Sequence, residues 1–266
     1  MSNHTDIEEP LLRNCRRILP AMFAIALSAC RTLAPSPSSP VDSAVTADDV
    51  IREYYSAVGG HDRIVAIHNR RMWGHYNEGD LHAATDIAWA RSGLRRVNVH
   101  APGFEYSEGF DGHTVWEYNH LTNHAVADTG AAEAAGRRGS GFDESIVDYG
   151  AKGYTVLLLG MDSVGARPAY RVRVTLTDGW VKDYYFDPAT HLILALRKAM
   201  PIHATGAPVE SLTEYGDWRT ESGVLQPYSF TEREVRTGRT MNTLQWDRIT
   251  SNVEISAADL GKPGKQ

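Results

Sequence analysis

Apolar and polar residues alternate most clearly between residues 170 and 200. In the first part of this stretch every second residue is apolar, namely Tyr170, Val172, Val174 and Leu176. A period of two is typical of a strand with one buried face. Asp178-Gly179 then predicts a tight type I′ hairpin, and residues 180–186 and 191–200 predict two more strands, separated by Asp187-Pro188. The stretch therefore predicts an antiparallel meander with one apolar side and one water-facing side.

Similar short runs predict further strands on both sides of this meander. Dipeptides rich in Gly, Asn, Asp and Pro separate them, as expected for turns. The predicted strands are 72–77, 84–91, 94–100, 104–110, 114–118, 123–127, a run that begins at Tyr154, and 210–220, 226–235 and 240–255. The whole chain thus predicts about a dozen strands, and the fold class is mainly β.

Helical patterns occur at two places only. Thr46, with Asp49 three residues later, predicts a capped helix that ends at Gly59-Gly60, and residues 62–68 predict a shorter helix after it. Residues 129–153 then interrupt the strands. This segment begins with a run rich in Ala, Gly and Arg, and it ends with three apolar residues near one helical face, Phe142, Ile146 and Tyr149. It predicts one or two short helices.

The first thirty residues have the pattern of a secretion signal. Three arginines, at positions 13, 16 and 17, precede a short apolar run over residues 18–29. That run is too short to span a membrane comfortably. It ends in Leu27-Ser28-Ala29-Cys30, which resembles the bacterial lipobox. The alternative is a plain secretory signal with a chance cysteine, and we prefer the lipobox because small residues directly precede Cys30.

The lipobox resemblance implies an anchor and a location. Cys30 would become the first residue of the mature chain and carry fatty acyl groups such as palmitate, and Arg31 after it implies transfer to the outer membrane of a Gram-negative bacterium. The Pro- and Ser-rich residues that follow predict a flexible tether. We therefore expect a signal peptide over 1–29, a lipidated cysteine and tether over 30–46, and one folded domain over 47–266.

Composition removes several classes of function. The formal net charge of −6 argues against a nucleic-acid partner, which needs a basic surface. Both cysteines, Cys15 and Cys30, precede the predicted domain, so the domain has no structural disulfide and no cysteine-ligated metal. No phosphate-binding or dinucleotide-binding glycine motif occurs in the sequence. We expect no cofactor.

The histidines are the strongest candidates for chemistry, but a simpler interpretation fits them better. His120 and His124 have the spacing of a helical ligand pair, yet they fall in a predicted turn without a catalytic glutamate. Another four recur every seven residues, at positions 61, 68, 75 and 82, across different kinds of element. Gly139-Ser140-Gly141 does not have the spacing of a nucleophile elbow. We therefore predict no catalytic residue and no metal site, with a metal-dependent hydrolase as a distant alternative.

Four stretches in a fixed order resemble the LolA/LolB-like family, in its broad outer membrane lipoprotein-sorting branch. They are YYSAVGGHDRIVAIHN (54–69), GFDGHTVWEY (109–118), the block over 154–193, and the closing stretch over 214–256. The resemblance implies an unclosed antiparallel β-barrel whose open side is covered by a few short helices, with a hydrophobic cavity between them. It therefore implies that residues 130–153 form a cover over the open side.

The resemblance also implies a ligand. In the carriers of this family the cavity takes lipoprotein acyl chains. We expect the apolar row of the meander to bind a lipid or acyl chain together with neighbouring tryptophans, so the predicted ligand-binding residues are Tyr170, Val172, Val174, Leu176, Trp89, Trp116 and Trp246. The same aromatic residues would equally fill a closed core. A non-enzymatic module with a filled barrel, which docks to another envelope protein, is therefore the alternative to a lipid-binding lipoprotein.

Overall fold

The computed structural model describes residues 45–119, 124–200 and 208–262. All of them belong to one compact unit that spans Ser38–Gln266. The predicted signal peptide, Cys30 and most of the tether lie outside the described residues, as does His120. None of the helices in the described ranges is both long enough and apolar enough to cross a membrane.

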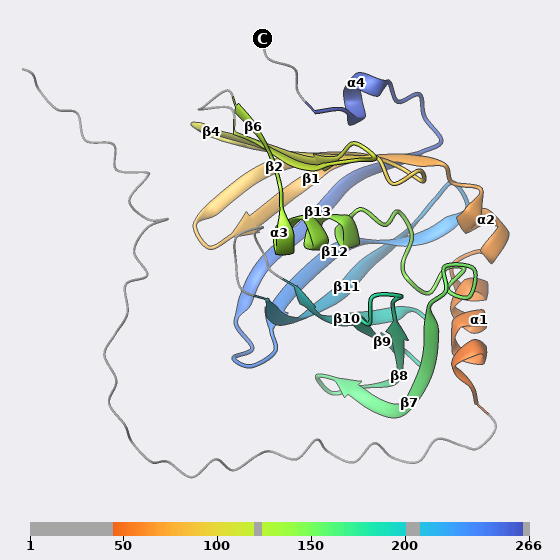
Figure 1. Ribbon diagram of the computed structural model, residues 1–266. Helices are drawn as coiled ribbons and strands as arrows, with labels where there is room; N and C mark the ends of the chain where they lie inside the picture. Colours follow the sequence, from red (N-terminus) through yellow and green to blue (C-terminus); the bar gives the residue numbers. More distant parts are fainter. Residues whose placement is uncertain (1–44, 120–123, 201–207, 263–266) are drawn as a thin grey trace, which may run out of the picture. The chain divides into compact units, whose positions relative to one another are not determined.

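Thirteen antiparallel strands form a single sheet in the described part of the chain (Figure 1). In chain order they are β1 (Asn69–Glu78), β2 (Leu81–Ala90), β3 (Arg95–Ala101), β4 (Phe104–Phe110), β5 (Val115–Asn119), β6 (His124–Ala127), β7 (Thr155–Val164), β8 (Arg167–Thr175), β9 (Val181–Phe186), β10 (Ile193–Met200), β11 (Val209–Glu221), β12 (Val224–Glu234) and β13 (Thr240–Ser251). The mainly β class and the individual strands predicted from sequence are confirmed.

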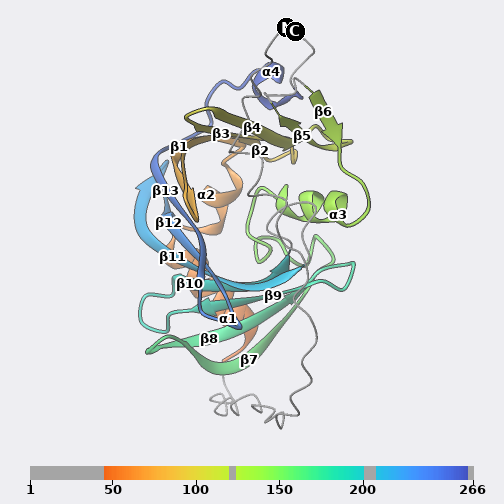
Figure 2. The same cartoon turned by 90° about the vertical axis from the view of Figure 1, so that its left-hand side faces the viewer.

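The sheet is curled but not closed. Its strand order is β6-β5-β4-β3-β2-β1-β13-β12-β11-β10-β9-β8-β7, so β6 and β7 are its two edges. Figure 2 shows β1–β6 facing β7–β10, with β11–β13 joining the two halves. The long β11, β12 and β13 strands provide this join: β11 and β12 pair along most of their length, whereas β12 and β13 pair only over 229–233 with 240–245, and the strands coil with the natural twist of a sheet.

The central meander forms as predicted, except for its turn. Leu176 and Trp180 still face each other just beyond the ends of β8 and β9, so the loop proper has three residues, 177–179. Of these only Gly179 has a positive φ, of 82°. A type I′ turn would need left-handed backbone at two successive residues. Instead the Leu176 amide donates to the Trp180 carbonyl at 2.8 Å. The Asp178 carboxylate accepts from the Trp180 amide at 3.0 Å, and the φ of Asp178 is not positive.

Helix α1 (Ala47–Ala57) begins with the predicted cap. Thr46 and Asp49 form a reciprocal capping box, so two otherwise unpaired amides are satisfied. After Val58, which caps the helix, the chain turns away at Gly59. The φ of Gly59, 112°, excludes most side chains, and a Cβ there would lie 2.3 Å from the Gly223 carbonyl oxygen. The short α2 (His61–Val65) follows it. The end of α1 is thereby fitted closely against the β11–β12 hairpin.

The main core lies between α1 and the β8–β9–β10 part of the sheet. Its members from the helix include Ile51 and Tyr54, and its members from the strands include Val172, Val174 and Phe186. Tyr54 meets Phe186 edge-on, with ring centroids 5.7 Å apart. An apolar helical face thus covers the apolar row of β8, as the hydrophobic effect requires for both elements.

Residues 129–153 divide into two unlike parts. The first part forms α3 (Gly130–Gly139), as the sequence predicted. Of the one or two short helices predicted here, only this one forms: residues 142–143 form a bend and residues 145–153 form turns, and we call 142–149 the turn segment. This turn segment belongs to the core: Ile146 is fully buried, and its carbonyl accepts from the Tyr55 hydroxyl at 2.6 Å. A last short helix, α4 (Ala257–Leu260), contacts β2 and β3.

Candidate functional site

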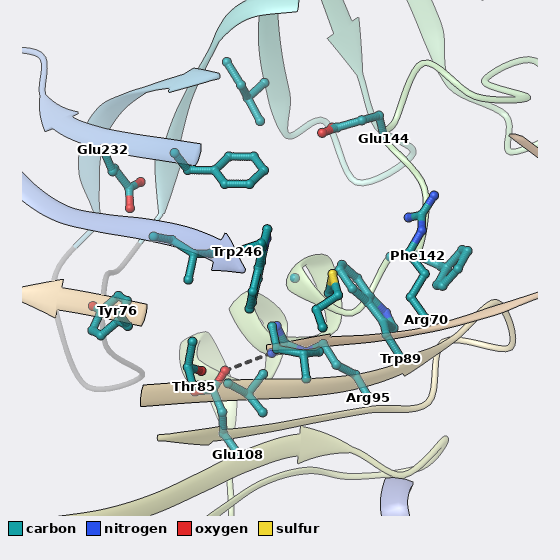
Figure 3. Close-up of a pocket in the computed structure, with 18 of the residues that line it drawn as sticks. Arg70, Tyr76, Thr85, Trp89, Arg95, Glu108, Phe142, Glu144, Glu232 and Trp246 are labelled. Atoms are coloured by element: carbon teal, nitrogen blue, oxygen red, sulfur yellow. Dashed lines mark hydrogen bonds and ion pairs between the residues drawn. The ribbon is translucent and has the colours of Figure 1, made fainter. Parts of the chain in front are cut away.

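A cavity of about 820 Å³ lies on the concave side of the sheet. Its walls are the inward-facing residues of β1–β5 and of β9–β13, with α3 and the turn segment 142–149 on the remaining side. Figure 3 shows eighteen of the lining residues, among them Trp89 and Trp246 near the middle of the group. The volume falls within the range of about 300–1,000 Å³ that small-molecule sites occupy.

The middle of the cavity is apolar. Alternate residues of neighbouring strands supply this lining, because successive side chains of a strand point to opposite faces. The principal apolar members are Met72, Ile87, Trp89, Val97, Val99, Phe230, Leu244 and Trp246. Met72, Trp246 and Ile249 also form a small buried cluster with Tyr228, which supports the wall from β12 and β13.

Two of the seven predicted ligand-binding residues line the cavity. Trp89 and Trp246 do so, from β2 and β13. Trp89 is held in place because its indole N–H donates to the Ser140 carbonyl at 3.0 Å and its ring meets Phe142 edge-on. The cavity wall is thus joined to the end of α3 and to the turn segment, two parts that sequence patterning did not connect.

The predicted row on β8 lies elsewhere, under α1. Val172 and Val174 have no exposed surface and belong to the closed core, with Tyr170 and Leu176 packed at its margin. The row was expected to face a ligand, but it faces an apolar helix. The alternation identified the buried face of the strand correctly, and it carried no information about what covers that face.

Trp116 is also absent from the cavity wall. Its neighbours Val115 and Glu117 line the cavity, so Trp116 points to the opposite face of β5. It is fully buried there, against Gly109, where a Cβ would lie 2.6 Å from the indole ring. Its role in the structure is therefore to fill the outer layer beside β4.

Glu144 is a cavity carboxylate with a hydrogen bond to each of its oxygens. Tyr184 donates to one of its oxygens at 2.9 Å, and Tyr215 donates to the other at 2.7 Å. The Tyr184 hydroxyl also accepts from the Ser145 amide at 3.0 Å. Burial, together with the Glu144 charge, raises the pKa of both tyrosines well above the ordinary value, so both hydroxyls remain donors. This network fixes the turn segment to β9 and β11.

Three of the basic side chains in the cavity have acidic partners. Arg95 pairs with Glu108 at 3.0 Å, and this pair is drawn as a dashed line in Figure 3. Lys198 lies 3.7 Å from Glu232. Burial alone would raise the pKa of Glu232, but Lys198 and the hydrogen bonds from Ser211 and Asn242 hold it below the ordinary value. The third basic residue, Arg138 of α3, pairs with Asp178.

Helix α3 is held at both sides of the hollow. On one side Gly136 packs on Val115 of β5, and Arg137 donates to the His113 carbonyl at 2.6 Å. On the other side Arg138 pairs with Asp178, in the β8–β9 turn, at 2.6 Å. The helix therefore bridges the two halves of the curled sheet and lines the cavity between them. The prediction of a covering segment applies to α3, whereas the turn segment is part of the core.

The histidines identified in the sequence do not converge. His61 bonds Asp148 at 2.7 Å, His75 lies 3.1 Å from Asp247, and His82 bonds Asn77 at 2.7 Å. Within the described ranges no three His, Cys, Asp or Glu side chains are grouped as a metal site. The Ser140 hydroxyl donates to the Arg137 carbonyl at 2.7 Å, so it caps the end of α3.

The geometry of the site suits binding of an apolar molecule with few polar contacts. An apolar middle gains free energy from each group that it removes from water, and the aromatic walls tolerate varied shapes. Sequence reasoning missed Arg70, Phe142 and Glu144, which lie at the edge of this apolar middle. Arg70 occurs in Arg70-Arg71 at the start of a strand, where alternation alone places one of the two arginines on the inner face.

Among the comparisons with known proteins, only the search of solved structures found matches. A search of protein-family models found no match, and neither did a search of curated protein sequences. A DUF1329 family protein from Desulfovibrio piger matches with a TM-score of 0.57 and 13% identity, over 81% of this chain and 99% of that one.

Two further matches carry names that concern lipoproteins. An outer membrane lipoprotein-sorting protein domain from Vibrio parahaemolyticus matches with a TM-score of 0.55 and 9% identity, over 80% of this chain and 94% of that one. The LolA superfamily protein NE2245 from Nitrosomonas europaea matches with a TM-score of 0.54 and 10% identity, over 82% of this chain and 99% of that one. At such identities the likeness concerns the fold, and the resemblance predicted from sequence is confirmed at that level: this chain has a LolA-like fold.

Proposed function

We propose that the protein is a non-enzymatic envelope lipoprotein that binds a lipid or a lipoprotein acyl chain in the cavity under α3. The observation that carries this proposal is the cavity of about 820 Å³ with its apolar middle. A barrel filled by its own side chains, as the alternative of an interaction module requires, would lack this space. The role of such binding would be lipoprotein sorting, lipid transport or maintenance of the envelope.

The likeness to a lipoprotein-sorting domain and to a LolA superfamily protein supports the same conclusion. The proposal includes an anchor at Cys30, which would hold the domain on the periplasmic side of the outer membrane. The net charge of −6 is compatible with these partners and offers no attraction for nucleic acid. Another envelope protein that donates or accepts the ligand would be the natural second partner.

The test is a titration with a fluorescent fatty acid. The full chain carries Cys30→Ala and is made by cell-free synthesis, so that acyl groups on Cys30 cannot occupy the cavity. We expect saturable binding. Val97→Trp, which fills the cavity from β3, should weaken it at least tenfold, whereas Val181→Trp, on a side chain that is 39% exposed, should not. Absence of saturable binding by a folded chain would favour the interaction module instead.

A further inference from the structure

Arg70 is a half-buried cation whose Nε atom is fully buried and has no hydrogen-bond partner. It lies on the inner face of β1 and lines the cavity. Neither a hydrogen bond nor an ion pair joins its guanidinium to another described side chain, and its Cζ atom lies 4.8 Å from the centre of the Phe142 ring. A charge that is removed from water without a partner is costly, so such a group marks a candidate ligand site.

The nearest acid does not neutralise Arg70. Asp143 forms a two-point pair with Arg91, whose second contact is 3.2 Å, and Arg91 approaches the same Phe142 ring at 5.0 Å. The positive charge of Arg91 therefore lies near Arg70, and Asp143 is already engaged by Arg91. Burial lowers the pKa of Arg70 from its ordinary value, yet an arginine stays charged in proteins. Asp143 and Glu221 act on Arg70 only through space, so its guanidinium donors stay open to a ligand.

Among the described residues that line the cavity, Lys182 is the other cation that forms no ion pair, and its chemistry differs. Lys182, on β9, lies 5.2 Å from the Trp180 ring. Burial lowers its pKa to about 8, so it can lose its charge by releasing a proton. Arg70 has no such route. A planar guanidinium also presents two parallel N–H groups to a carboxylate, which an ammonium group cannot do.

The carboxylates at the opposite end of the cavity have partners of their own. Figure 3 places Arg70 beside Phe142 at one end of the group of residues, and Tyr76 and Glu232 at the other. Tyr76 donates to Glu78 at 2.5 Å, and Glu232 pairs with Lys198 at 3.7 Å. Tyr76 follows Arg70 by six positions in β1, a span of about 20 Å in a strand. An anionic headgroup therefore finds open guanidinium donors at the Arg70 end and carboxylates at the other.

We propose that the cavity binds an amphiphile with a carboxylate headgroup, of the long-chain fatty acid class, with the carboxylate on Arg70 and the tail along β1 towards Tyr76. This inference rests on the proposed function and adds the class and the orientation of the ligand. Phe142 lies against the guanidinium, and Trp89, which packs on Phe142, is the cross-strand partner of Arg70; both shield a bound carboxylate from water, which strengthens its pairing with Arg70. The apolar middle takes the tail.

The experiment compares a fatty acid with the fatty alcohol of the same chain length. Both compete with a fluorescent fatty-acid probe for the full chain carrying Cys30→Ala. A charge-assisted hydrogen bond in a dry site is typically strong enough for the acid to bind about 10- to 100-fold more tightly than the alcohol. Arg70→Met should remove this preference for the acid and leave the binding of the fatty alcohol unchanged. It should also raise the melting temperature, because it removes an unpaired buried charge.

Three further variants make the result specific. Arg70→Lys keeps the charge without the planar donors and should show an intermediate preference. Arg71→Met is the matched control, since Arg71 pairs with Asp259 at 3.0 Å and is not part of the cavity wall. Lys182→Met should keep the preference. The inference is overturned if wild type binds acid and alcohol equally, or if Lys182→Met loses the preference while Arg70→Met keeps it. Absence of binding by either ligand would overturn the proposed function as well.

Discussion

Val174→Glu distinguishes the two roles that the β8 row could have. If the row lined a ligand site, a charge there would abolish binding in a folded protein. In the structure Val174 has no exposed surface and lies beneath α1, in contact with a closed core. Lys182, whose pKa burial lowers to about 8, lies directly opposite Val174 in the β8–β9 register, so a glutamate beneath α1 must be buried either as one half of an ion pair with Lys182 or as a neutral acid. We therefore expect the main effect to be on folding.

The size of that effect follows from the pKa. For a glutamate held as a neutral acid, desolvation raises the pKa in the folded state above 7, whereas it stays near 4.3 in the unfolded chain; a pair with Lys182 would lower both this pKa and the cost below. Keeping it neutral at pH 7 then costs about 3.7 kcal/mol, and at pH 5 about 1 kcal/mol. The folded state binds the proton more tightly, so stability relative to wild type increases as the pH falls. The difference of about 2.7 kcal/mol corresponds to a shift in melting temperature of roughly 5–11 °C.

The assay is thermal unfolding followed by circular dichroism at pH 5 and pH 7. Val174→Gln serves as the control, because it has a similar size and does not titrate. We expect the deficit of Val174→Glu against wild type to shrink at pH 5, while the deficit of Val174→Gln stays constant. A Val174→Glu chain that melts like wild type at both pH values but no longer binds ligand would refute the assignment of this row to the core.

Three other predictions concern the anchor, the cover and the polar network. Cys30→Ala should leave the protein soluble or unprocessed in cells, as fractionation would show; a variant that is cleaved elsewhere and stays on the membrane would contradict the lipobox. Asp178→Asn should speed amide hydrogen exchange in α3, since it weakens the pair with Arg138, and leave residues 142–149 protected; equal exchange in both segments would argue against α3 as a movable cover. Tyr184→Phe should lower the melting temperature by about 3–12 °C, because Glu144 and the Ser145 amide each lose a partner; an unchanged value would mean that water replaces the hydroxyl.

Local patterns were sufficient to predict most of the fold. Alternation identified the strands because each has one buried face, and the Thr46–Asp49 capping box was readable because its geometry is local. The β8–β9 turn was less certain, since the same Asp-Gly pair suits a two-residue or a three-residue loop and the strand register decides between them. The turn segment 142–149 was misjudged as helix because its burial comes from α1 and β9, which are distant in sequence.

The candidate site was harder to predict than the fold. Whether an inward-facing residue meets a helix or a cavity depends on where α1 packs, and no local pattern encodes that: Val172 meets the helix, while Trp89 meets the cavity. Arg70 was overlooked because adjacent Arg71 makes both look like surface residues. Its importance becomes visible only once Asp143 is seen to pair with Arg91 instead.

Quenching of tryptophan fluorescence by a brominated fatty acid tests the location of the ligand most directly. Trp89, Trp218 and Trp246 line the cavity, whereas Trp73 is not part of its wall and is covered by Arg248, 3.8 Å from the ring. We expect saturable quenching of the wild-type chain, its loss in a triple variant in which Trp89, Trp218 and Trp246 are each replaced by Phe, and its retention in Trp73→Phe. Quenching that persists in the triple variant, or that disappears in Trp73→Phe, would contradict an acyl chain in this cavity.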